Sequence, residues 1–401
     1  MKMIPFSPPD ITEAEINEVI GVLKSGWITS GPKKKEFEDM LTSYCGVDRA
    51  ICLSSATVSM ELVLRVLGIG PGDEVITTAY TYTASASVIH HVGAKIVLVD
   101  TAPGSFEIDY DKIGDAITEK TKAIISVDLG GRICDYDKIY SVVNSKKHLF
   151  SAGNNDVLKA LGRIAVIADS SHGLGSKRNG LSSGQFADFT CFSFHAVKNL
   201  TTAEGGAAVW KTVKGIDNDY LYKQFMLYSL HGQNKDALDK TKAGAWEYDI
   251  VFPGYKCNMT DIQAALGVSQ LKRYADMIAH RKALVENYEN AFKDILDLRI
   301  IHFDGENESN CHLYLATFPI TIEQRNEIIE LCAQKGVILN VHYKPLPLLT
   351  AYKDLGFNID DYPNSYNIYK SEISFPLYST LSFEDQKTVI DTFIEVYNSV
   401  K

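Results

Sequence analysis

Lys198 lies in the setting that most favours chemistry in this sequence. The segment 192–199 reads FSFHAVKN, and Gly205-Gly206 follows shortly after it. Apolar and aromatic surroundings disfavour a charged ammonium, so a lysine held there loses its proton more readily than one on a solvated surface. A neutral amine is a nucleophile that forms a Schiff base with an aldehyde. A single lysine is more often an exposed surface residue, so the rest of the chain has to supply the other groups that this chemistry needs.

Two polar side chains follow an apolar run elsewhere in the chain. Residues 164–168 read IAVIA and predict a buried strand; Asp169 follows directly, and His172 comes three residues later. A carboxylate at the carboxyl end of a strand can hold a proton on a ring nitrogen of an aromatic ligand, and His172 can reach a phenolic oxygen of that ligand. Asp169 also fits a helix N-cap or a turn, and His172 fits an ordinary buried histidine.

A short polar segment, Ser54-Ser55-Ala56-Thr57, separates a predicted strand from a predicted helix. Hydroxyls and backbone N–H groups at such a helix start bind phosphate, although a plain Ser/Thr cap fits the same pattern. Ser193, five residues before Lys198, adds a hydroxyl. Tyr82 follows another predicted strand and offers a flat ring for stacking, or simple packing.

Together these residues meet the four requirements of pyridoxal 5'-phosphate (PLP): a lysine, a carboxylate for the ring nitrogen, a flat surface for the ring and a phosphate site. Each candidate lies at a predicted strand end, so one sheet would bring them together. We interpret the chain as a PLP enzyme with Lys198, Asp169 and His172 as catalytic residues. The seven cysteines show no metal-ligand spacing, so we expect no metal site.

Short apolar runs alternate with helical segments over the first half of the chain. This alternation predicts an α/β fold with a mostly parallel sheet and helices on both faces. The helical segments include Val58–Leu67 and Tyr110–Ile117. The predicted strands are Ala50–Leu53, Glu74–Thr77, Lys95–Val99, Ala123–Val127, Ile164–Ala168, Phe189–Phe192 and Ala207–Trp210.

We expect three parts: an N-terminal arm (1–32), a large PLP-binding domain (33–255) and a small α+β C-terminal domain (256–401). The arm carries a helix whose apolar face holds Ile16, Val19, Ile20 and Leu23. Residues 145–162 read as a polar surface insertion. A long helix starts near Met259, and the C-terminal part is expected to contain strands at Leu313–Ile320 and Gly336–Val341 and helices at Glu323–Lys335 and Phe383–Ser399.

Composition limits the partners of the chain. Its 401 residues carry a formal charge of −10, which argues against nucleic acid or an anionic membrane surface as the main partner. No segment has the roughly 18 consecutive apolar residues of a membrane span, and the N-terminus lacks the apolar run of a signal peptide. We expect a soluble cytoplasmic protein with reduced cysteines.

Nearly the whole chain resembles the DegT/DnrJ/EryC1/StrS family of PLP-dependent sugar aminotransferases. The similarity lies in the lysine motif and in the segments 26–32 (GWITSGP), 68–76 (GIGPGDEVI), 121–125 (TKAII) and 254–265 (GYKCNMTDIQAA). Ala56, Ala196 and Ala203 are similar to the branch that makes UDP-4-amino-4-deoxy-L-arabinose, where other branches more often have Gly, Pro and Gly.

The resemblance implies the fold-type I, aspartate aminotransferase-like fold, and a homodimer that shares its active sites. It implies transfer of an amino group from L-glutamate, which leaves as 2-oxoglutarate, to a UDP-4-keto sugar during surface polysaccharide or lipopolysaccharide synthesis, with pyridoxamine phosphate as the intermediate cofactor form. Substrate contacts are expected at Thr29, His342 and Tyr343. The implied cofactor contacts are Ser55, Ala56, Thr57, Tyr82, Asp169, His172, Ser193, Lys198 and, from the neighbouring subunit, Asn258.

Some features leave alternatives open. Residues 145–162 have no counterpart in typical members, and Pro347 stands where many members have a second histidine, so the sugar stays open. A 3-keto sugar or a dTDP- or GDP-4-keto sugar is an alternative substrate. Dehydratases of the family replace the lysine by histidine, so Lys198 argues against that activity. A sugar-nucleotide-binding regulatory protein is the non-enzyme alternative.

Overall fold

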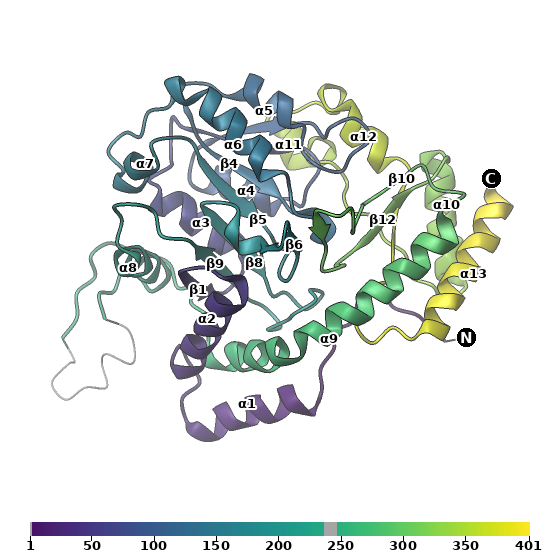
Figure 1. Cartoon of the computed structure of the whole chain (residues 1–401), viewed down its shortest axis with the longest axis horizontal. Coiled ribbons are helices and arrows are strands. Elements are labelled where there is room, and N and C mark those ends of the chain that lie inside the picture. The colour runs from purple at the N-terminus through teal and green to yellow at the C-terminus, as the bar shows by residue number, and fades with distance from the viewer. Residues whose placement is uncertain (1, 236–246) are drawn as a thin grey trace.

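The computed structural model describes residues 2–235 and 247–401. Its centre is a seven-stranded sheet in which one strand, β9, runs antiparallel to its neighbours and the others are parallel. Figure 1 shows this sheet surrounded by helices, with a smaller C-terminal unit beside it. The sheet order is β1 (Arg49–Leu53), β9 (Gly206–Trp210), β8 (Phe189–Ser193), β5 (Ala165–Asp169), β4 (Thr121–Val127), β2 (Glu74–Thr78) and β3 (Lys95–Val99).

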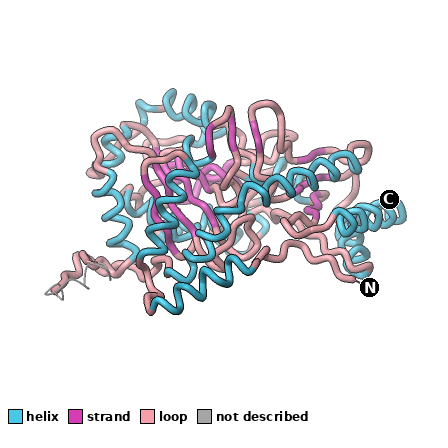
Figure 2. The backbone as a smooth tube through the Cα atoms, turned by 60° about the horizontal axis from the view of Figure 1, so that its bottom comes forward, coloured by secondary structure: helices cyan, strands magenta, loops and turns pink. Residues whose placement is uncertain are grey.

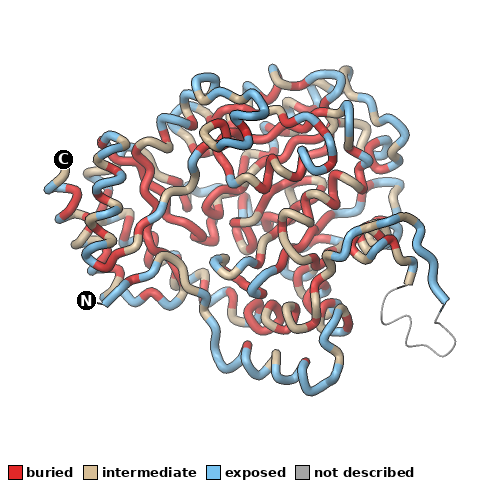
Figure 3. Tube along the Cα trace, turned by 180° about the vertical axis from the view of Figure 1, so that it is seen from behind, coloured by how far each residue is buried: buried red, intermediate tan, exposed pale blue. Residues whose placement is uncertain are grey.

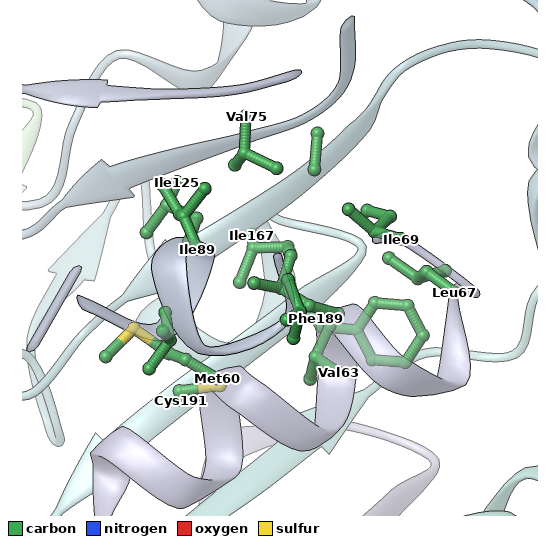
Figure 4. Packing of buried hydrophobic residues seen from close by; sticks show 14 of the residues in the cluster. Met60, Val63, Leu67, Ile69, Val75, Ile89, Ile125, Ile167, Phe189 and Cys191 are labelled. Carbon is green, nitrogen blue, oxygen red and sulfur yellow. The ribbon is translucent and has the colours of Figure 1, made fainter. Parts of the chain in front are cut away.

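All seven strands predicted from the sequence are present, with ends within two residues of the expected ones. Adjacent residues of each strand pack into different cores because side chains alternate between the two faces of a sheet. Val75, Ile125 and Ile167 belong to one cluster, whereas Ile76, Ile124 and Val166 belong to another. Figure 4 shows the first cluster, in which Met60 and Val63 from a helix lie close to strand residues such as Phe189.

Helices cover both faces of the large sheet, which confirms the predicted α/β fold class. One face is covered by α3 (Ala56–Val66), α4 (Ala84–His91), α7 (Asp156–Leu161) and α8 (Asn218–Ser229). The other face is covered by α2 (Pro32–Cys45), α5 (Tyr110–Ala116), α6 (Tyr136–Ser145) and α9 (Asp261–Phe292).

Helix α9 links the large sheet to the C-terminal unit (Figures 1 and 2). Thr260 caps it in a capping box with Gln263, and the helix continues for 32 residues. The C-terminal unit contains β10 (Leu298–Arg299), β12 (Tyr314–Thr317) and β13 (Glu372–Phe375) in one sheet, with α10 (Ile322–Gln334), α12 (Pro363–Tyr369) and α13 (Phe383–Val400). Helix α11 (Thr350–Asp354) instead packs against the large sheet, because its Tyr352 belongs to the cluster of Val75 and Ile125. A third sheet joins β11 (Asn307–Glu308), β6 (Lys177–Arg178) and β7 (Leu181–Ser182). Short 3-10 helices are η1 (Leu129–Gly131), η2 (Lys147–Leu149), η3 (Ser183–Gln185), η5 (Leu346–Leu348) and η6 (Ile359–Asp361).

Three expectations need correction. The strand expected at Gly336–Val341 is replaced by isolated bridges at Val337 and Asn340, and the strand expected at Leu313–Ile320 is limited to β12. The segment 145–162 is not wholly a polar surface insertion, because Val157 and Leu158 of α7 are buried in the core. Its polar composition hid these two apolar residues, which lie next to each other in a short helix.

Helix α1 (Glu13–Ser25) confirms the helix expected in the arm but turns its apolar face outward. Ile16, Ile20 and Leu23 are 43%, 38% and 54% exposed, while Glu15 and Val22 are buried. Glu15 is buried because it pairs with Arg273 of α9 and closes the capping box with Thr12. The outer side of α1 is exposed in Figure 3. None of the helices in the described ranges is long and apolar enough to span a bilayer.

Candidate active site

A cavity of about 530 Å³ opens at the carboxyl ends of the parallel strands. It is bounded by the end of β5, the loop after β8, the start of α3, the loop after β2 and a C-terminal segment at 340–343. Ligands of parallel α/β sheets gather at this edge. The cavity brings together ten of the residues predicted from the sequence: Ser55, Ala56, Thr57, Tyr82, Asp169, His172, Ser193, Lys198, His342 and Tyr343.

Lys198 lies in the loop that joins β8 to β9. The backbone N–H of Lys198 donates to the carbonyl of His195 at 2.9 Å, and the backbone N–H of Thr202 donates to the carbonyl of Phe194, so the loop folds back on itself. Burial lowers the pKa of Lys198 to about 8, and the negative charge of Asp169 opposes this shift. At pH 7 such an amine is neutral in about one-tenth of molecules, against about 0.03% for a lysine with an ordinary pKa. The loop therefore presents a nucleophilic amine to the cavity.

Asp169 ends β5 and is fixed by three hydrogen bonds. Ser171 donates to Oδ1 from its backbone N–H at 3.2 Å and from its hydroxyl at 2.5 Å. Ser85 donates to Oδ2 at 2.7 Å, and the Ser85 hydroxyl lies 2.9 Å from that of Thr81. The carboxylate is 5% exposed and lines the cavity, so it is placed to interact with a ligand group there.

The tautomer of His172 follows from its two contacts. Gly130 N–H donates to Nδ1 at 3.1 Å, so this nitrogen carries a lone pair. Burial holds the pKa of His172 well below its ordinary value, with further lowering from Lys198 and His342, so the ring is neutral. The proton is therefore on Nε2, which lies 3.2 Å from the Tyr343 hydroxyl and donates to it. His172 presents an N–H donor toward the cavity.

His312 also lines the cavity, although no sequence pattern pointed to it. Its ring centroid lies 4.3 Å from that of His172. Its Nδ1 lies 2.9 Å from Oδ1 of Asn199, whose Nδ2 donates to the carbonyl of Asn310. Nδ1 therefore carries the proton, because Oδ1 can only accept. His172 and His312 are separated in the chain by 140 positions, so no local sequence pattern connects them.

The start of α3 has the geometry of a phosphate site. Ser55 caps the helix by accepting from Val58 N–H at 3.1 Å, and the N–H groups of Ala56 and Thr57 open the first turn, where a helix lacks internal partners. Gly206 lets β9 approach this turn, because a Cβ there would lie 2.3 Å from the nitrogen of Ala56. With the dipole of an 11-residue helix, these donors suit a phosphate.

The residues in the cavity fit PLP on their own geometry. An amine with a lowered pKa, a fixed carboxylate and a helix start with open N–H groups surround one space. Ser193 lies on the same wall, and Tyr82, 60% exposed, has its ring 6.0 Å from that of Tyr343. Lys198 would bind the aldehyde of the cofactor, Asp169 would contact its ring nitrogen, and the start of α3 would hold its phosphate.

Two predicted contacts do not line this cavity among the residues that the structure describes. Thr29 is exposed, and its carbonyl accepts from Asp261 N–H at the start of α9. Asn258 donates to the hydroxyl of Ser30 at 2.6 Å and accepts from Lys256. The predicted contacts of Thr29 with substrate and of Asn258 with a neighbouring subunit stay predictions.

The sequence matches a family model over residues 9–394, described as the DegT/DnrJ/EryC1/StrS aminotransferase family. The spore coat polysaccharide biosynthesis protein SpsC of Bacillus subtilis is 35% identical, with 98% of this chain and 97% of SpsC covered. The UDP-4-amino-4-deoxy-L-arabinose–oxoglutarate aminotransferase of Shewanella sediminis is 32% identical, with 98% of each chain covered.

Solved structures of similar proteins have the same fold as this chain. Spr1654 of Streptococcus pneumoniae in its PMP form is 53% identical and superposes with a TM-score of 0.96, with 99% of this chain and 100% of that chain covered. Its PLP form gives the same TM-score at 52% identity, with both chains covered completely. This similar protein was solved both with PLP and with PMP, the pyridoxamine phosphate form of the cofactor. The two structures support the assignment of the cavity to PLP.

Proposed function

The chain belongs to the DegT/DnrJ/EryC1/StrS aminotransferase family, and we propose that this PLP-dependent sugar aminotransferase moves the amino group of L-glutamate to a UDP-4-keto sugar. The observation that carries the proposal is the convergence of Lys198, Asp169 and the start of α3 on one cavity. The arabinose aminotransferase from Shewanella supports a UDP-linked 4-keto sugar, and SpsC supports a role in polysaccharide synthesis.

Bound PLP supplies an aldehyde and a ring that accepts electrons. With PLP bound, Lys198 would supply the amine for its aldehyde and, as a free amine, would move a proton as general base and acid, for which a pKa of about 8 suits neutral pH. Asp169 would keep a proton on the ring nitrogen of PLP, and His172 would offer its Nε2–H as a hydrogen-bond donor in the cavity. The same residues serve both half-reactions: glutamate gives its amine and leaves as 2-oxoglutarate, and the sugar ketone then receives the amine.

The decisive experiment presents the PLP-loaded protein with glutamate and a panel of keto-sugar nucleotides: UDP, dTDP and GDP, each as the 3-keto and the 4-keto sugar. The amine product is detected by mass. We expect the UDP-4-keto sugar to react fastest. Faster reaction of a 3-keto, dTDP- or GDP-linked sugar would replace the substrate assignment by one of those alternatives.

Lys198→Ala is expected to abolish turnover while the protein still binds pyridoxamine phosphate. Lys112→Ala, at an exposed position of α5, is the matched control and is expected to react normally. Undiminished activity of Lys198→Ala would overturn the assignment. The purified enzyme is expected to show a visible absorbance band that borohydride bleaches. Absence of this band would favour the alternative, a sugar-nucleotide-binding regulatory protein.

We further propose a homodimer in which Asn258 reaches the phosphate of the neighbouring subunit. The outward apolar face of α1, made of Ile16, Ile20 and Leu23, supports a second copy as a partner, because exposed apolar faces of this kind mark interaction surfaces. Within its own subunit, the backbone of Asn258 bridges to Leu53 at the end of β1, and its contact with the neighbouring subunit is the part of this proposal that comes from the family resemblance.

A further inference from the structure

A closed group of three side chains lies behind the cavity wall formed by His342. Glu372 and Ser374 are alternate residues of β13 and are fully buried. Glu372 Oε1 lies 2.5 Å from the Ser374 hydroxyl, which lies 2.9 Å from Nδ1 of His342. The backbone N–H of His342 donates to Oε2 of Glu372 at 2.9 Å and completes the circuit.

This circuit has two arrangements in which every hydrogen bond is made. When Glu372 is ionised, the Ser374 hydroxyl donates to it, so Nδ1 of His342 has to donate to Ser374 and Nε2 keeps a lone pair. When Glu372 is protonated, its O–H donates to Ser374, and Ser374 donates to Nδ1, so the proton of the ring is on Nε2. One proton on a buried carboxyl therefore decides the tautomer of His342.

The imidazole of His342 lines the cavity and stacks on Phe6, with ring centroids 5.3 Å apart. Because Nδ1 is turned to Ser374, Nε2 is the ring nitrogen left for a ligand. Burial and the nearby Lys198 lower the pKa of His342 to about 3, so the ring stays neutral at working pH. The cavity therefore meets either a donor or an acceptor at this nitrogen.

Glu372 is the titrating group of the circuit. Burial raises its pKa to about 8, although its hydrogen bonds and the positive charge of Arg325 act in the opposite direction. Tyr80 and Tyr343 face it from the cavity side, and Tyr80 donates to the carbonyl of His342 at 2.9 Å. On the side away from Glu372, His342 faces three basic side chains: Lys198, His172 and His312.

We propose that Glu372 and Ser374 are positioning residues that make His342 present an N–H donor to the ketone oxygen of the sugar substrate. This rests on the proposed sugar aminotransferase function. The donor form holds while Glu372 is protonated. Ionisation of Glu372 at higher pH converts Nε2 into an acceptor, which faces the lone pairs of that oxygen and weakens sugar binding without placing a charge in the cavity.

Glu372→Gln separates the two arrangements. The amide oxygen replaces Oε2 as the acceptor for His342 N–H, and the amide NH₂ then donates to Ser374, so the variant keeps the donor form of His342 at every pH. Ser374→Ala breaks the circuit, and Ser374→Thr keeps the hydroxyl in a strand that accepts β-branched residues.

The first readout is the ¹⁵N NMR spectrum of the histidine side chains in the PLP-loaded protein, with His342 assigned from a His342→Gln variant. We expect wild type and Ser374→Thr to change from Nε2–H to Nδ1–H as the pH rises through about 8. Glu372→Gln is expected to stay Nε2–H, and Ser374→Ala to lose the transition. An unchanged His342 tautomer from pH 6 to 9 in wild type would overturn the proposal, whatever the substrate is.

The second readout is the pH profile of each half-reaction. In wild type, kcat/KM for the sugar falls above pH 8, mainly through KM, and this fall disappears in Glu372→Gln. The glutamate half-reaction is expected to have the same profile in both proteins. A fall that persists in Glu372→Gln would refute the role of Glu372. Absence of any sugar reaction would refute the proposed function and leave the NMR test to decide the circuit.

Discussion

Replacing Asp169 by Asn tests whether the charge of this carboxylate supports the reaction. Asn has the same shape, and the hydrogen bonds accommodate it. Its amide oxygen takes the place of Oδ1, which accepts twice from Ser171. Its NH₂ takes the place of Oδ2 and donates to Ser85, whose hydroxyl proton then turns toward Thr81. The variant therefore removes the charge and keeps the network.

The expected loss follows from the burial of the site. Removing one partner of a buried ion pair costs about 3–5 kcal/mol, which corresponds to about a 10²- to 10⁴-fold lower rate. Asp169 is 5% exposed, so solvent screens little of its interaction with a protonated ring nitrogen. We expect a loss in this range in the glutamate half-reaction, measured in a single turnover by cofactor absorbance.

Asp169→Asn also changes the titration of Lys198. The charge of Asp169 opposes the effect of burial on the lysine, so its removal is expected to lower the pKa of Lys198 below about 8. Capture of PLP by the apoprotein needs the neutral amine. Its rate therefore rises with pH through about 8 in wild type and levels off at a lower pH in the variant.

Asp128→Asn is the matched control for the Asp169 variant. Asp128 is also buried, accepts from Ser170 at 2.7 Å and has its pKa raised to about 6 by burial, yet it does not line the cavity among the described residues. The control is expected to react at nearly the wild-type rate. A half-reaction rate in Asp169→Asn equal to that of the control, with PLP fully bound in both, would refute the reasoning.

Gly206→Ala is expected to weaken PLP binding, because the new Cβ would lie 2.3 Å from the nitrogen of Ala56 and push the first turn of α3 away. Gly21→Ala in α1, where no atom lies within 4 Å, should leave PLP affinity unchanged and raise stability by up to about 1 kcal/mol; equal affinities of the two variants would contradict this. The proposed dimer predicts twice the monomer mass in solution and weaker PLP binding in Asn258→Ala. A fully active monomer would contradict it.

The predictable part of the fold is the part in which local pattern and final environment agree. Apolar runs such as 164–168 are buried on both faces of the sheet, so the sequence alone indicates a strand and places Asp169 at its end. Lys198 and Ser55 were found for the same reason, since each lies in the segment that follows a strand. The resemblance to the family then supplied the roles of these residues.

Other features depend on contacts that no local pattern contains. The apolar stripe of α1 could be read from the sequence, but the direction it faces could not, because ion pairs of Arg273 with Asp10 and Glu15 turn the other side of the helix toward α9. The circuit of His342 joins it to a strand about 30 residues further along. His312 reaches the cavity through Asn199, which is 113 residues away in the chain.

Burial determines the charge of Lys198 and of three histidines that line the cavity. Burial lowers the pKa of Lys198 to about 8 and the pKa of His342 to about 3, and it holds the pKa values of His172 and His312 well below their ordinary value. Of these four residues, the lysine is therefore the one that exchanges a proton near neutral pH, while the three imidazoles act as neutral hydrogen-bonding groups. Because backbone and amide partners fix the proton on His172 and His312, a substrate meets a defined pattern of donors and acceptors there. At His342 this pattern depends on Glu372, so the proposed circuit adds a pH dependence to sugar binding that the glutamate half-reaction does not share.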